Sequence, residues 1–139
     1  MKSAGGLRHT HPNFWLTAVA AAVVLAWLGG GYLLLDQSST NFRYVTEVAP
    51  VPWFGAGFLA ASAAICAGMR TAPIVFRAGL AVGAGLNVFF AVCFLMAIIE
   101  DQQQTGKVTG SGAPALYGFL AVYLIAASRE PRSNPDAAR

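Results

Sequence analysis

The stretch from residue 14 to residue 35, FWLTAVAAAVVLAWLGGGYLLL, decides the fold class of this chain. Its 22 residues carry no charged side chain. As a helix with a rise of about 1.5 Å per residue, it would reach about 33 Å, enough to cross a hydrocarbon core of about 30 Å. It is also longer than the apolar core of a secretory signal, which has about 7–15 residues. The stretch therefore predicts a retained transmembrane helix.

Three further apolar stretches follow, at residues 53–69, 74–99 and 114–128. We expect an external loop at residues 36–52, a tight turn from Arg70 to Pro73, and a polar loop at residues 100–112. The last stretch is shorter than the usual span of about 17–25 residues. It reaches 21 residues if it begins at Val108, with Pro114 inside a membrane helix that can tolerate it. The sequence predicts an all-α integral membrane bundle of four transmembrane helices.

Composition leaves room for a single membrane domain. The chain has 139 residues, of which only 11% are charged, against about a quarter in soluble proteins. We assign residues 1–13 to a cytoplasmic leader, residues 14–128 to the transmembrane domain, and residues 129–139 to a disordered cytoplasmic tail. The net charge of +3 comes from short flanks rather than from a basic stripe, which argues against a nucleic-acid partner.

The basic residues indicate the orientation. Seven of them fall in the leader, the middle turn and the tail, and the other two lie in the remaining loops beside four acidic residues. This asymmetry predicts that both termini are cytoplasmic, in a multi-pass protein of the cytoplasmic (inner) membrane. The residues that we expect to set the topology are Arg8, Arg70, Arg77, Arg129 and Arg132.

Small residues recur at every fourth position in three of the four stretches. Such ridges let helix backbones approach closely in lipid, where no hydrophobic force draws helices together. The fourth stretch breaks the pattern, because Val122 follows Gly118 at that spacing. We expect packing within the bundle, and leave self-association open because one ridge per helix can be used up inside it. The predicted packing residues are Ala18, Ala22, Ala26, Gly30, Ala60, Ala64, Gly68, Gly79, Gly83, Asn87, Gly118, Ala121 and Ala126.

Asn87 is the one amide within the apolar part of a stretch. A buried Asn in a membrane helix usually bonds a neighbouring helix, and we expect that role here, with a pore or ligand contact as the alternative. Among the aromatic residues, Tyr117 is predicted to lie at the membrane interface and Trp27 to pack between helices.

No residue pattern predicts catalysis or a bound cofactor. The sequence has no metalloprotease, hydrolase or nucleotide-loop motif and no histidine within an apolar stretch. The pair His9 and His11 offers two ligands in the leader, too few to define a metal site. Transporters mark their path with ionisable residues inside the membrane, and here Arg77 at an edge is the nearest candidate. We expect no enzyme activity, no cofactor and no metal.

The overall size, the four-stretch layout and the basic tail SREPRSNPDAAR at residues 128–139 resemble small membrane proteins of actinobacterial phages. Several of those proteins are holins. The resemblance implies a protein that accumulates in the cytoplasmic membrane, oligomerises laterally and opens a timed lesion for an endolysin. The alternative is an accessory or partner-binding subunit of a membrane complex, or a phage exclusion factor. Its contact would be the first external loop, through Phe42, Tyr44, Val45 and Val48.

Overall fold

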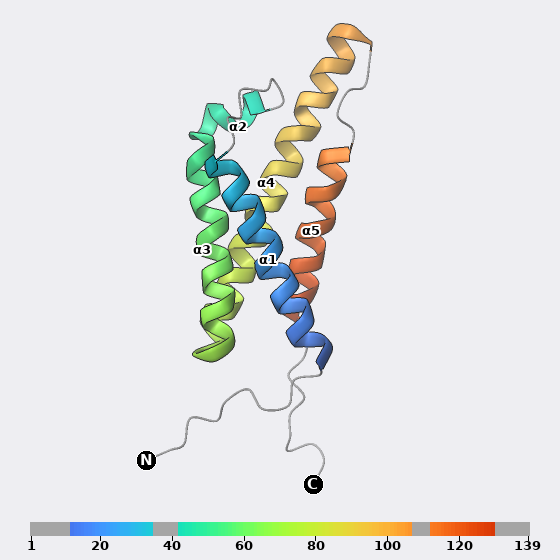
Figure 1. Ribbon diagram of the computed structural model, residues 1–139. Helices are drawn as coiled ribbons and strands as arrows, with labels where there is room; N and C mark the ends of the chain where they lie inside the picture. Colours follow the sequence, from blue (N-terminus) through green and yellow to red (C-terminus); the bar gives the residue numbers. More distant parts are fainter. Residues whose placement is uncertain (1–11, 35–41, 107–111, 130–139) are drawn as a thin grey trace, which may run out of the picture.

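The computed structural model describes residues 12–34, 42–106 and 112–129, and these residues form helices and short connections without a strand (Figure 1). The helices are α1 (Pro12–Leu34), α2 (Arg43–Val48), α3 (Val51–Arg70), α4 (Pro73–Thr105) and α5 (Gly112–Arg129). The all-helical prediction is confirmed for this part of the chain.

The four longer helices run up and down beside one another, and the short α2 lies at the end where α1 finishes and α3 begins (Figure 1). Helix α3 packs extensively on both α1 and α4, and α4 packs extensively on α5. Contacts between α1 and α5 are sparse. The helices therefore form a row that curls without closing tightly, and a seam remains between its first and last members.

Three of the helices, α1, α3 and α4, are long and apolar enough to cross a membrane, and α5 is a shorter apolar helix. Large apolar side chains on the outside of the bundle are well exposed, such as Trp27 at 82% and Ile74 at 77%. An apolar exterior over helices of this length is typical of a membrane protein, because lipid tails rather than water surround it.

Proline and glycine set several of the helix ends. Pro52 and Pro73 lie in the first turns of α3 and α4, where the missing N–H is no loss. Between these helices, the Thr71 amide still donates to the Ala67 carbonyl at 2.9 Å. Helix α4 ends at Gly106, whose φ of 67° lies in the left-handed region that glycine adopts without strain.

Two predicted loops are partly helical. Helix α4 continues to Thr105, so the polar segment that begins at Glu100 is helix for its first turn and a half. The change from apolar to polar residues at Glu100 marks the end of the apolar part of α4, not the end of the helix. The expected external loop at residues 36–52 contains α2, and α5 begins at Gly112, between the two starts considered above.

Candidate functional site: the helix interfaces and the α2–α4 contact

Glycines make the closest helix contacts in the bundle. A Cβ atom added to Gly29 of α1 would lie 2.8 Å from the carbonyl oxygen of Gly55 on α3. One added to Gly79 of α4 would lie 2.9 Å from the Ala61 carbonyl oxygen of α3. Such distances leave no room for any side chain, so these backbones pack directly on each other. The every-fourth-residue pattern identified Gly79 but not Gly29 or Gly55.

Most of the predicted packing residues lie in helix interfaces. Ala18, Ala22 and Ala121 are buried, and Ala26 and Ala64 are half-buried. Gly68 lies directly against the backbone of Phe76, and Gly83 faces Leu25 and Leu124.

Four of the predicted packing positions lie outside the helix interfaces within one copy of the chain. A Cβ added to Gly30 or Gly118 would meet nothing within 4 Å, and Ala60 and Ala126 are exposed. For Gly30 and Ala60 the reason is geometric: a row of every fourth residue turns by about 40° per step around an α-helix. One end of such a row therefore leaves the interface in which its other residues lie.

Ser62 forms a buried hydrogen bond between two helices. The sequence predicted such a role for Asn87 instead. The Ser62 hydroxyl on α3 donates to the Ala22 carbonyl oxygen on α1 at 2.7 Å, in a buried position. The Asn87 side chain is fully buried but donates through Nδ2 to the Gly83 carbonyl oxygen of its own helix, also at 2.7 Å. The predicted interhelix bond from Asn87 is therefore absent among the described residues.

At the α2 end of the bundle, a cluster of aromatic rings joins the four long helices to Phe42, the residue just before α2. Phe90 of α4 lies at its centre, with ring centroids 5.0 Å from Tyr32 and 5.4 Å from Tyr117. The hydroxyls of Tyr32 and Tyr117 contact each other, which links α1 to α5. The cluster consists of Tyr32, Phe42, Phe58, Phe90, Phe94 and Tyr117. The sequence predicted Tyr117 at the membrane interface and Trp27 between helices. In the structure Tyr117 is buried in this cluster, whereas Trp27 faces outward.

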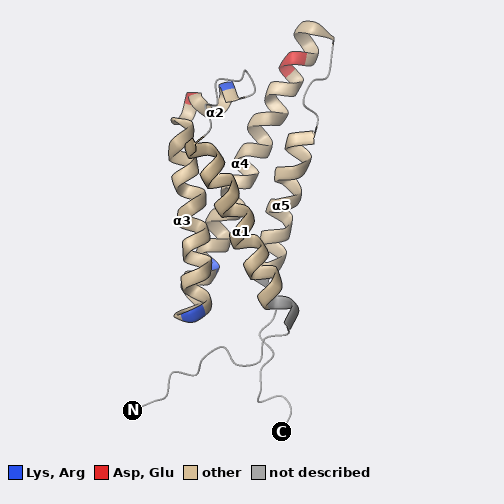
Figure 2. Cartoon of the chain, viewed as in Figure 1, with Lys and Arg blue, Asp and Glu red and all other residues tan. Residues whose placement is uncertain are grey.

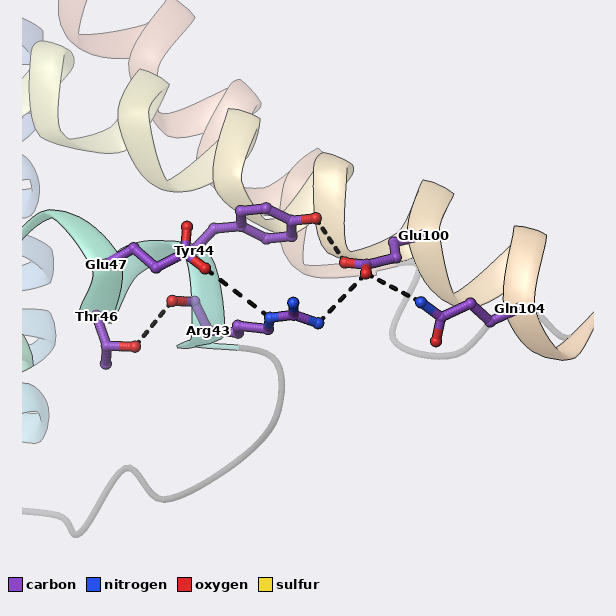
Figure 3. Close-up of polar contacts among 6 residues, drawn as sticks. All are labelled: Arg43, Tyr44, Thr46, Glu47, Glu100 and Gln104. Atoms are coloured by element: carbon purple, nitrogen blue, oxygen red, sulfur yellow. Dashed lines mark hydrogen bonds and ion pairs between the residues drawn. The ribbon is translucent and has the colours of Figure 1, made fainter.

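Helix α2 is held to α4 by polar contacts around Glu100 (Figure 3). The Tyr44 hydroxyl donates to Glu100 Oε2 at 2.5 Å, and Arg43 Nη1 donates to Oε1 at 3.3 Å. Gln104, one turn along α4, donates to the same Oε1 at 3.0 Å. Arg43 also pairs with Glu47 on its own helix at 3.9 Å. Beneath these polar groups, Val45 of α2 is fully buried.

These hydrogen bonds favour an ionised Glu100 and a neutral Tyr44. The bond from Tyr44, with help from Arg43 and Gln104, lowers the pKa of Glu100 below its ordinary value of 4.5. The same bond raises the pKa of Tyr44 above its ordinary value of 10.0, because it favours the hydroxyl that donates it.

The charged residues divide between the two ends of the bundle (Figure 2). Arg70 at the end of α3 and Arg77 in the first turns of α4 lie at one end, and both are exposed. Arg43, Glu47 and Glu100 lie at the other end. Arg129 is the last residue of α5, whereas Arg8 and Arg132 lie outside the described residues.

Within the described part of the chain, no three His, Cys, Asp or Glu side chains gather where they could hold a metal ion. Among the described residues, hollows at the bundle surface include the following two. One lies between α1, α4 and α5 beside Asn87, and the other lies between α4 and α5 beside Gly85. No family model, curated protein or solved structure matches the chain.

Proposed function

We propose that the chain crosses the cytoplasmic membrane four times with both termini in the cytoplasm. In support, the start of α1, the end of α3 and the end of α5 lie at the same end of the bundle as Arg70 and Arg77 (Figure 2). The opposite end carries acidic groups as well as Arg43. The 18 residues of α5 would reach about 27 Å, close to the thickness of the hydrocarbon core.

On this topology, we propose a non-enzymatic, holin-like role: the protein permeabilises the membrane after it associates laterally with copies of itself. One observation carries the proposal, namely the groove between α4 and α5 on the outside of the bundle. It has a volume of about 390 Å³, and Ala81, Ala84 and Gly85 are among the residues that line it. A Cβ added to Gly85 would meet nothing within 4 Å, and Ala81 is exposed, so these two positions are not used inside one copy, whereas Ala84 is buried.

Small residues at an open groove let a second helix approach the backbone closely, and close packing drives helix association in lipid. A lesion made in this way requires contacts between copies and no reacting side chain. The partners of the chain are then the lipid bilayer and further copies of itself, with no cofactor.

The test compares the wild-type protein with Gly85→Leu during induced expression in a bacterial host. We expect the wild-type protein to accumulate harmlessly and then to collapse the membrane potential abruptly, as read by a potential-sensitive dye. Gly85→Leu fills the groove and should delay or abolish the collapse at equal membrane content. Ala63→Leu, at an exposed position on α3, is the matched control and should behave as the wild type.

Normal growth and an unchanged membrane potential at high wild-type content would contradict the holin-like role. A second candidate, an accessory subunit or a phage exclusion factor, is favoured by the exposed apolar residues at the α2 end. Of the contact residues expected for this role, Val48 is 66% exposed, whereas Phe42 and Val45 are buried; Trp53, nearby on α3, is 73% exposed. Co-purification of one membrane partner that is lost in Val48→Asp would support that role.

A further inference from the structure

The seam between α1 and α5 is bridged near each end and hollow between the bridges. Towards α2, the hydroxyls of Tyr32 and Tyr117 meet. Towards the other end, the Tyr123 hydroxyl donates to the Thr17 carbonyl oxygen at 3.3 Å. Elsewhere α1 and α5 make few contacts with each other. The seam is thus a short window in the side of the bundle rather than an open cleft.

A pocket of about 200 Å³ lies in this window. Ala21 and Leu25 of α1 and Leu120 and Leu124 of α5 form its walls, and Asn87 of α4 lies at its back. At its rim, Val24 is 36% exposed and Phe119 is 68% exposed, so the pocket opens on the apolar outside of the bundle. An engineered apolar cavity of about 150 Å³ holds benzene, so this volume suits a small ring or a short stretch of chain.

Asn87, one of the residues that line this pocket, holds a buried hydrogen-bond acceptor for which the described residues provide no partner. Its side chain is fully buried, and Nδ2 is occupied by the Gly83 carbonyl oxygen. Exchanging the amide oxygen and nitrogen would set two acceptors against each other, so the orientation of the side chain is fixed. Oδ1 has no hydrogen-bond partner among the described residues. A buried acceptor of this kind favours an occupant that donates a hydrogen bond.

We propose that this window is a binding site for a membrane-dissolved alcohol or phenol, with its hydroxyl donating to Asn87 Oδ1 and its hydrocarbon part against α1 and α5. The walls select an apolar body, and the depth of Asn87 near the middle of α4 disfavours a charged donor such as an ammonium group. A single water molecule suits the site poorly, because buried waters usually make about three hydrogen bonds and the walls here are hydrocarbon. The site goes beyond the proposed lysis role and does not depend on it.

The experiment uses the full chain in lipid nanodiscs and two probes of the same shape, 4-propylphenol and 4-propyltoluene. Binding is measured by equilibrium dialysis, with empty nanodiscs subtracted. We expect the phenol to bind the wild-type protein about fivefold more tightly than the toluene analogue, as one net hydrogen bond implies. The carbonyl carbon of the Asn87 side chain should shift in the NMR spectrum when the phenol binds, and should not shift with the analogue.

Two variants make the test specific. Asn87→Leu keeps the volume of the side chain but removes the acceptor, and should bind the two probes equally. Ala20→Phe places a ring at the exposed rim and should abolish saturable binding of both, whereas Ala63→Phe, at an exposed position on α3, should not. Equal binding of the two probes to the wild type, a phenol preference retained in Asn87→Leu, or undiminished binding to Ala20→Phe would overturn the proposal.

Discussion

At the scale of single residues, two neighbouring glycines differ in whether they contact another helix. Gly29 and Gly30 follow each other on α1, yet only Gly29 lies against the backbone of α3. In lipid, such backbone contact takes the place of the hydrophobic force that packs soluble proteins. One methyl group is thus enough to distinguish a packing glycine from its neighbour.

We expect Gly29→Ala to lower the free energy of unfolding by about 1–3 kcal/mol, because the new Cβ would overlap Gly55. Gly30→Ala adds the same atom to open space and should be neutral, or stabilising by up to about 1 kcal/mol through its helix propensity. Unfolding of both variants in mixed detergent micelles, followed by circular dichroism, measures the difference. Equal stability of the two variants would show that α1 and α3 do not meet at Gly29.

The hydroxyl of Ser62 gives a second prediction at this scale. Ser62→Ala removes the bond to the Ala22 carbonyl oxygen, and should lower the free energy of unfolding by about 1 kcal/mol or less, as is usual for such bonds in membranes. Ser128→Ala is the control, because Ser128 is on α5 and donates within its own helix to Ile125. Its loss should change the stability less than the loss of the Ser62 hydroxyl.

At the scale of elements, α2 is the helix whose attachment depends on ionisable groups. The lowered pKa of Glu100 means that its contribution to the α2–α4 contact is present above about pH 4.5 and is lost as the pH falls through the lowered pKa. The raised pKa of Tyr44 means that its contribution is present below about pH 10 and is lost as the pH rises through the raised pKa. The contact is therefore complete between these limits.

Spin labels at Val48→Cys and Gln103→Cys, in a chain without its native cysteines, can follow this contact. We expect a narrow distance distribution at pH 7 that broadens when the pH falls through the lowered pKa of Glu100, and the same broadening at pH 7 in Glu100→Gln. Asp101→Asn removes a charge one residue away and should leave the distribution narrow. A distribution that stays narrow in Glu100→Gln would mean that the apolar contact of Val45 alone holds α2.

The existence and type of the long helices could be predicted from the sequence, since uncharged runs of this length have few alternatives. Their ends were harder to predict. Glu100 and the glutamines after it are polar but compatible with a helix. The polar residues therefore mark the end of the apolar segment, whereas the helix itself ends at Gly106. Helix α2 is too short for a periodic pattern, and its position depends on Glu100, which is distant in the sequence.

The site residues were predicted less completely, for a related reason. A spacing of four finds residues on one side of a helix but not which side faces a neighbour. Gly79 and Gly83 were found, whereas Gly55 and the hydroxyl of Ser62 depend on the rotation of α3, which only packing fixes. Tyr117 was expected at the membrane interface from its position near a helix end, yet its ring completes the aromatic cluster.

At the scale of the whole molecule, the aromatic cluster joins all four long helices. Phe90 is fully buried there and contacts rings from α1, α3 and α5. We expect Phe90→Ala to lower the free energy of unfolding by about 3–5 kcal/mol, the usual effect of removing a buried phenylalanine ring. Phe119→Ala, on the outside of α5, should change it far less. Thermal unfolding in detergent would measure both, and similar losses would place Phe90 outside the core.

The order of the long helices in space repeats their order along the chain: α1 packs on α3, α3 on α4, and α4 on α5. When each long helix is synthesised, the helix that it mainly packs on has therefore already been made. The helices can pack one after another, in chain order, during translation. The meeting of Tyr32 with Tyr117, 85 residues apart, then comes last and brings the two outermost helices together.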